Sequence, residues 1–133
     1  EVDEFDTGIR NIFNFGHSFG HAIETATNFG VPHGIAITMG MDIACQISHV
    51  RGSLPIQHSD RMRECLRKNY LPFTDVDIPV DDMFNALLKD KKNTTTMLGL
   101  ILPVGNRSRI ERVDISPDET FRKQLFAAVQ SLA

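Results

Sequence analysis

The sequence predicts a mainly helical domain that carries one small β-hairpin. Apolar residues recur three or four positions apart in several separate segments, which is the spacing of amphipathic helices. Two strand-like runs, "MLGLILP" and "RIERVDI", flank the turn-forming letters "VGNRS", which is typical of a hairpin. A chain of 133 residues is long enough to bury one hydrophobic core and too short for two ordinary domains.

Composition excludes several classes of protein. The apolar fraction of 41% and the charged fraction of 23% are close to globular averages, which argues against disorder. A net charge of -3 with mixed signs gives no reason to expect a nucleic acid or an anionic membrane as partner. No apolar run reaches the roughly 18 residues of a membrane span, and two cysteines are too few for a disulfide framework. We therefore expect a soluble, cytoplasmic protein.

The first helix is expected from Ile9 to about Phe29, where apolar residues recur at helical spacing. Gly16 and Gly20 lie one turn apart inside it, and each lowers helix stability by roughly 1 kcal/mol relative to Ala. Close approach of another helix or of a ligand would explain both glycines. Pro32 disfavours helix at the residue before it, so we expect the second helix from near His33 to about Val50.

N-cap residues mark the start of three further helices. The caps are Ser59 or Asp60 for one helix, Asp81 for the next and Ser116 for the last. The first two helices are expected to end near Asn69 and Lys89. Pro117 and Glu119 complete a capping box for the last one. Cys45 and Cys65 are interpreted as small buried hydrophobic residues.

Four polar side chains share one stripe of the first predicted helix. Arg10, Asn14, His17 and His21 are separated by four, three and four residues, which places them on one helical face. A helix needs a reason to bury such a face, because an unpaired buried polar group costs about 1–3 kcal/mol. An antiparallel second helix that begins near His33, behind the Gly-Val-Pro turn, would return His33 towards His17.

Imidazoles on two different elements suit a borderline cation such as zinc. A catalytic zinc usually has three protein ligands and an open position. His17 and His33 supply two ligands, and a third is not evident in the sequence. Spacing alone predicts a metal or anion site of unknown substrate, and for any single histidine the alternative is a structural or surface role.

The segments "RNIFNFGHSFGHAIE" and "PHGIAITMGMDIA" resemble the C-terminal domain of dehydroquinate synthase, within the sugar-phosphate cyclase superfamily. The family pattern is an Arg, then Asn-Phe/Leu-Gly-His-Thr-Phe-Gly-His-Ala-Ile-Glu, then His-Gly-Glu-Ala-Val. "LLKDKKN" and the hairpin "LGLILPVG" also resemble family segments. The resemblance implies that residues 1–133 form the family's helical C-terminal domain, and that its N-terminal NAD-binding domain is absent from this chain.

The resemblance also implies roles for the polar stripe. His17 and His33 would ligate zinc or cobalt, with a Glu of the N-terminal half as third ligand. Arg10 and Asn14 would bind the carboxylate and hydroxyl groups of the substrate, where an Arg offers a bidentate grip. We expect NAD to be held by the N-terminal domain, because no Gly-rich dinucleotide fingerprint occurs here.

Three further residues are assigned by the same resemblance. His21 would lie beside the substrate phosphate and help to move protons, as a catalytic and substrate-binding residue. Asp6 stands where the family has a catalytic Glu at the edge of the site. Lys91 would reach the substrate from a loop.

The implied activity is that of a carbon–oxygen lyase in the shikimate pathway of aromatic amino acid biosynthesis. It is the cyclisation of a seven-carbon keto-acid phosphate to 3-dehydroquinate, with elimination of phosphate, zinc and NAD as cofactors and a homodimer as assembly. The chain alone would be inactive, because it lacks the NAD-binding domain and one metal ligand.

Two alternatives stay open within the same fold. Ile35 stands where the family has a Glu after His-Gly, which leaves room for another sugar-phosphate cyclase. "GVPHG" is also similar to iron-type alcohol and polyol dehydrogenases, although these lack the two "FGH" segments. An alternative of another class is a non-catalytic helical binding or assembly module, which would not need the polar stripe.

Overall fold

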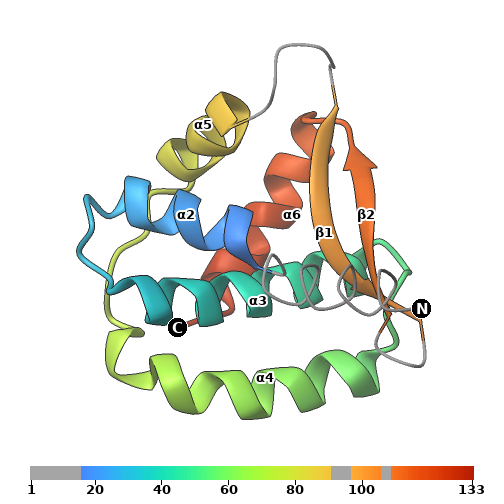
Figure 1. Cartoon of the computed structure of the whole chain (residues 1–133), viewed down its shortest axis with the longest axis horizontal. Coiled ribbons are helices and arrows are strands. Elements are labelled where there is room, and N and C mark those ends of the chain that lie inside the picture. The colour runs from blue at the N-terminus through green and yellow to red at the C-terminus, as the bar shows by residue number, and fades with distance from the viewer. Residues whose placement is uncertain (1–15, 91–96, 106–108) are drawn as a thin grey trace, which may run out of the picture.

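Helix α3 (His33–Val50) lies at the centre of the computed structural model, and the other elements pack around it (Figure 1). The structure describes residues 16–90, 97–105 and 109–133. Helix α2 lies along one side of α3 and helix α4 along another, while α6 and the hairpin contact the same central helix. The bounds are α2 His17–Ala26, α4 Ile56–Tyr70, a 3₁₀ turn Leu71–Phe73, α5 Val80–Asp90, β1 Leu98–Val104, β2 Arg109–Ile115 and α6 Glu119–Gln130.

The predicted fold class is confirmed, and so is the predicted hairpin. Strands β1 and β2 pair antiparallel with Leu98 opposite Ile115 and Val104 opposite Arg109. Alternate residues of β1 are buried, as a half-buried strand requires. The Ser48 hydroxyl of α3 donates a hydrogen bond of 2.5 Å to the carbonyl of Pro103, so β1 is tied directly to the central helix.

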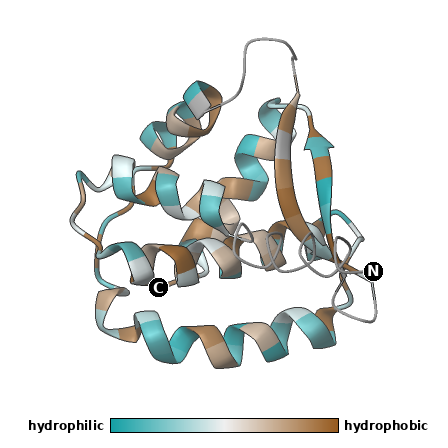
Figure 2. Ribbon diagram, viewed as in Figure 1, coloured by the Kyte–Doolittle hydropathy of each residue, from teal (hydrophilic) through white to brown (hydrophobic). Residues whose placement is uncertain are grey.

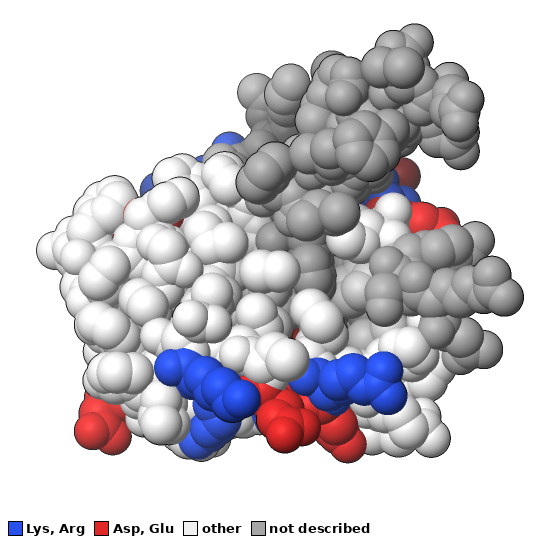
Figure 3. All heavy atoms as spheres, turned by 60° about the horizontal axis from the view of Figure 1, so that its bottom comes forward, with Lys and Arg blue, Asp and Glu red and all other residues white. Residues whose placement is uncertain are grey.

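The core lies between α3 and the elements that surround it. Hydrophobic residues concentrate on α3 and β1, whereas α4 is largely hydrophilic (Figure 2). Basic and acidic side chains lie next to each other along the lower edge of the face in Figure 3, so that edge carries mixed charge. Within the described residues, no helix has the length and apolar character that a bilayer span requires.

The second predicted helix is confirmed at both ends, but the first is wrong at its start. Gly16 adopts a left-handed φ of 82° and directly precedes α2, which begins at His17. A regular helix cannot pass through a residue of that conformation. The helix that carries His17 and His21 therefore begins at His17, whereas Arg10 and Asn14 lie outside the described residues. At the other end α2 stops at Ala26, before the predicted Phe29.

The three predicted caps are also wrong. Helix α5 begins at Val80, so Asp81 lies inside its first turn and does not cap it. The N-cap of α6 is Asp118, whose carboxylate accepts a hydrogen bond from the backbone N–H of Phe121. The last helix thus begins two residues later than a cap at Ser116 would place it. Helix α4 begins at Ile56, so Ser59 lies inside it, is buried, and accepts a hydrogen bond from Gln46. The Ser59 hydroxyl, which the sequence pattern assigned to a helix cap, instead forms a hydrogen bond between two helices.

Candidate functional site

Glycines at the crossing of α2 and α3 bring the two backbones into contact. A Cβ atom on Gly40 would lie 2.2 Å from the carbonyl oxygen of Gly16 and 2.6 Å from the amide nitrogen of Gly20. A Cβ on Gly20 would in turn lie 2.9 Å from the carbonyl oxygen of Ala36. The prediction that these glycines reflect close approach of another helix is confirmed, and the crossing fixes α2 and α3 relative to each other.

A tight turn at residues 27–32 reverses the chain between the two helices. Asn28 and Phe29 both have positive φ, and the amide of Phe29 donates to the carbonyl of Glu24. Pro32 is the N-cap of α3, so His33 is its first helical residue. The antiparallel pair (Figure 1) therefore places His33 opposite the middle of α2.

Three imidazoles meet on the face that this helix pair leaves open. The ring centroid of His17 lies 6.2 Å from that of His21 and 6.3 Å from that of His33. The side chains of His21 and His33 are 50% and 65% exposed, so solvent or a partner can reach both rings. The predicted return of His33 towards His17 is confirmed.

The separation of the rings suits a shared metal ion. Two imidazoles that bind one zinc at the usual Zn–N distance of about 2 Å have ring centroids about 5 Å apart. The centroids of His17 and His33 are 6.3 Å apart, and small side-chain rotations cover the difference. By distance alone, His17 could share an ion with either His21 or His33.

A buried carboxylate lies behind the imidazoles. Glu24 is only 7% exposed, and its Oε1 lies 3.0 Å from Nδ1 of His33 and 3.7 Å from Nδ1 of His21. Sequence reasoning did not single out Glu24. Its position three residues after His21 continues the stripe of polar residues on α2, and that spacing was the available signal.

The described part of the chain supplies an incomplete metal site. Across residues 16–90, 97–105 and 109–133, no group of three or more His, Cys, Asp or Glu side chains could hold a metal ion. The other predicted site residues, Asp6, Arg10, Asn14 and Lys91, lie outside the described residues.

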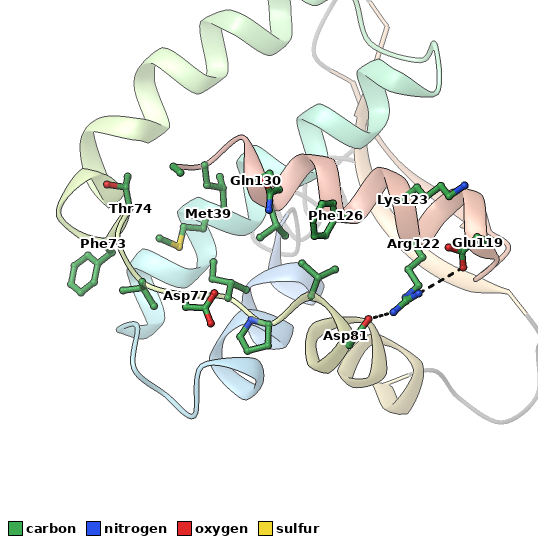
Figure 4. Close-up of a pocket in the computed structure, with 17 residues that line it drawn as sticks. Met39, Phe73, Thr74, Asp77, Asp81, Glu119, Arg122, Lys123, Phe126 and Gln130 are labelled. Carbon is green, nitrogen blue, oxygen red and sulfur yellow. Dashed lines mark hydrogen bonds and ion pairs between the residues drawn. The ribbon is translucent and has the colours of Figure 1, made fainter.

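A cavity lies elsewhere in the molecule. It has a volume of about 630 Å³ and lies between the segment 73–81 and helix α6 (Figure 4). Arg122 pairs with Asp81 and Glu119 at its edge, while Met39 and Phe126 are among its apolar lining residues. None of the three histidines lines this cavity, so it is separate from the imidazole cluster.

A sequence-family model described as "3-dehydroquinate synthase C-terminal" matches residues 1–93. The chain belongs to this family. The resemblance that the two "FGH" segments predicted is therefore confirmed, and the matched region includes all three clustered histidines and Glu24.

Relatives of this 3-dehydroquinate synthase C-terminal domain carry the names of several sugar-phosphate cyclases. A 3-dehydroquinate synthase of Acetivibrio thermocellus is 34% identical over 129 residues, which is 97% of this chain and 36% of the relative. A 2-epi-valiolone synthase of Actinosynnema mirum is 34% identical over 122 residues, 88% of this chain and 32% of the relative. The chain thus spans about a third of the length of the curated relatives it matches.

Solved structures show the same fold with bound ligands. A 2-deoxy-scyllo-inosose synthase complexed with carbaglucose-6-phosphate, NAD⁺ and Co²⁺ superposes with a TM-score of 0.70 at 26% identity, over 97% of this chain and 36% of that one. The 2-epi-5-epi-valiolone synthase ValA of Streptomyces hygroscopicus, with NAD⁺ and Zn²⁺ bound, gives 0.67 at 28% identity, over 90% and 32%. The chain is therefore a C-terminal domain of the dehydroquinate synthase-like sugar-phosphate cyclases.

Proposed function

We propose that this domain is the metal- and substrate-binding half of a 3-dehydroquinate synthase that depends on zinc and NAD. The observation that carries the proposal is the meeting of His17 and His33, from two helices that touch at glycines, with ring centroids 6.3 Å apart on an open face. A purely structural domain has no need to present imidazoles from two elements at that separation. The activity would belong to aromatic amino acid biosynthesis.

His17 and His33 would hold the metal. Metal-ligating histidines usually donate their second ring N–H to a carboxylate or a carbonyl. The contact of His33 with Glu24, at 3.0 Å, meets that pattern better than the 3.7 Å separation at His21. When bound, zinc polarises a substrate hydroxyl and NAD accepts and returns a hydride.

The remaining assigned residues would grip the substrate, a phosphorylated sugar acid. Arg10 would pair with its carboxylate, Asn14 with its hydroxyl groups, and Lys91 would reach it from a loop. His21, whose ring adjoins that of His17, would contact the phosphate and transfer a proton through a ring nitrogen. Asp6 would act at the edge of the site.

An N-terminal domain outside these 133 residues would complete the enzyme. It would bind NAD and supply the third metal ligand, a Glu, to the open face of the histidine cluster. Both the relatives' greater length and the two-imidazole site support this division. The chain alone is then expected to be inactive, and the complete enzyme to be a cytoplasmic homodimer.

A second candidate is another sugar-phosphate cyclase. It is favoured by the names of the relatives and solved structures, which include 2-epi-valiolone synthase and 2-deoxy-scyllo-inosose synthase. Ile35, which replaces the family Glu, packs against the hydrophobic core, so it adds no polar group to the site. The same names give no support to an iron-type polyol dehydrogenase.

The test is phosphate release by the domain combined with its N-terminal half, with NAD and zinc supplied. The seven-carbon keto-acid phosphate is compared with a hexose 6-phosphate, the class that carbaglucose-6-phosphate imitates. We expect release from the keto acid, and its loss in His17→Ala and His33→Ala. The matched control is His58→Ala, which alters a histidine of α4 outside the cluster.

The outcomes separate the candidates. Release that survives both cluster substitutions would contradict the metal assignment. Release from the hexose phosphate alone would favour a different cyclase. Absence of release from every sugar phosphate, together with absence of zinc binding, would favour the non-catalytic module.

A further inference from the structure

Glu24 is a buried carboxylate to which the proposed reaction assigns no chemical step. It lies on α2, is 7% exposed, and follows the buried residues Ala22 and Ile23 on that helix. Removing a carboxylate from water is unfavourable unless hydrogen bonds or opposite charges compensate. Its position therefore requires a compensating partner.

The partners that the structure gives this carboxylate are imidazoles. Oε1 of Glu24 lies 3.0 Å from Nδ1 of His33, which is hydrogen-bond distance, and 3.7 Å from Nδ1 of His21. A carboxylate accepts hydrogen bonds and does not donate them. Nδ1 of His33 must therefore carry the proton of this contact.

This hydrogen bond selects one form of the His33 ring. In a neutral imidazole one nitrogen carries the proton and the other holds a free lone pair. A proton on Nδ1 leaves the lone pair on Nε2, which is the atom then able to bind a metal. The His33 side chain is 65% exposed and starts a helix, so few packing contacts hold its ring.

We infer that Glu24 is a positioning residue that holds His33 in the tautomer and orientation needed for metal binding. The inference rests on the proposed metal site, and it assigns Glu24 to orienting a ligand rather than to ligation. Carboxylates in this position typically strengthen metal binding by about 10–100-fold. Because Glu24 is buried, its carboxylate has few alternative conformations, so it holds the His33 ring in one orientation.

The test compares Glu24→Leu and Glu24→Gln in the domain combined with its N-terminal half. The probe is Co²⁺, whose affinity is followed by visible absorption. Leu removes the acceptor but suits a buried position, and Gln keeps a neutral carbonyl acceptor. We expect Co²⁺ affinity to fall about 10–100-fold in Glu24→Leu and less in Glu24→Gln. The matched control is Glu64→Gln, at an exposed position of α4.

A second measurement separates orientation from stability and from ligation. Nitrogen-15 NMR of the metal-free protein reports which ring nitrogen of His33 carries the proton. We expect Nδ1 in the wild type and in Glu24→Gln, and a shift towards Nε2 in Glu24→Leu. A merely structural carboxylate, or one that ligates the metal itself, would leave this tautomer unchanged.

His33→Ala shows which proposal fails if the expectation is not met. If His33→Ala loses Co²⁺ binding while Glu24→Leu binds as tightly as the wild type, the role of Glu24 is overturned and the metal site stands. If His33→Ala binds Co²⁺ as tightly as the wild type, both proposals are overturned.

Discussion

The two cysteines of the chain occupy opposite environments. Cys45 lies on α3 and is fully buried, whereas Cys65 lies on α4 and is exposed, so the prediction that both are buried is wrong for Cys65. Burial raises the pKa of the Cys45 thiol from 9.0 to about 12, and the nearby Asp42 carboxylate adds to the rise while Arg63 opposes it. Low polarity disfavours the thiolate.

The raised pKa of Cys45 predicts loss of stability in alkali. Well below pH 9.0 the thiol is protonated in both folded and unfolded chains. Above that pH the unfolded chain releases the proton while the folded chain keeps it, so the free energy of unfolding falls until about pH 12. The full contribution is on the order of 4 kcal/mol. Urea unfolding at a series of pH values measures it.

Cysteine variants isolate this contribution from that of Tyr70. Burial and a hydrogen bond to Asp42 also raise the pKa of Tyr70, so the free energy of unfolding of the wild type falls in alkali for two reasons. The free energy of unfolding of Cys45→Ala should fall less steeply with pH, although it is about 1 kcal/mol lower at neutral pH because of the missing side chain. Cys65→Ala should follow the wild type. Equal slopes in Cys45→Ala and the wild type would contradict the assignment.

Only part of the candidate site could be predicted from the sequence. The approach of His33 to His17 was predictable, because helical spacing and a Pro-containing turn are local properties of the sequence. Glu24 was not singled out, because a lone Glu on a helix is usually solvated, and its burial depends on how α2 packs. The roles of Arg10 and Asn14 stay predictions.

At the scale of elements, the glycine contact between α2 and α3 controls the geometry of the site. A Cβ on Gly40 would lie 2.2 Å from a backbone oxygen, and a backbone atom cannot rotate away as a side chain can. By contrast, a Cβ at Gly34 on the same helix would meet nothing within 4 Å. Replacement of glycine by alanine is therefore expected to have opposite effects on stability at positions 40 and 34.

Gly40→Ala should destabilise the protein and Gly34→Ala should not. Forcing α2 away from α3 costs about 1–3 kcal/mol, as overpacking of a core does. Gly34→Ala should raise the free energy of unfolding by up to about 1 kcal/mol through helix propensity. Chemical denaturation of both variants measures the difference. A Gly40→Ala protein as stable as the wild type would contradict the close crossing.

Element boundaries were predictable where the signal is local and strong. The ends of α3 were predicted correctly and those of the two strands to within one residue, because Pro32 and Gly105 end regular structure by their own chemistry. The break at Gly16 was not predicted, because a glycine is compatible with both helix and left-handed backbone. The contact with α3 decides between them.

At the scale of the whole molecule, one buried charge connects α3, α4 and the end of α6. Asp42 is fully buried, accepts hydrogen bonds from Nε of Arg63 and from the hydroxyl of Tyr70, and Arg63 also donates to Ser131. Among the described residues, no buried side-chain nitrogen or oxygen lacks a hydrogen-bond partner. The network thus joins segments that are far apart in sequence.

Breaking this network should destabilise the fold more than breaking an exposed pair of the same residue types. Asp42→Asn leaves the Arg63 guanidinium, only a quarter exposed, without its charge partner, and removal of one member of a buried ion pair costs about 3–5 kcal/mol. Asp114 pairs with Arg112 in the hairpin, with both side chains more than half exposed. Asp114→Asn should therefore change stability by about 0.5 kcal/mol or less. Equal losses in urea unfolding would show that the Asp42 charge does not hold α3, α4 and α6 together.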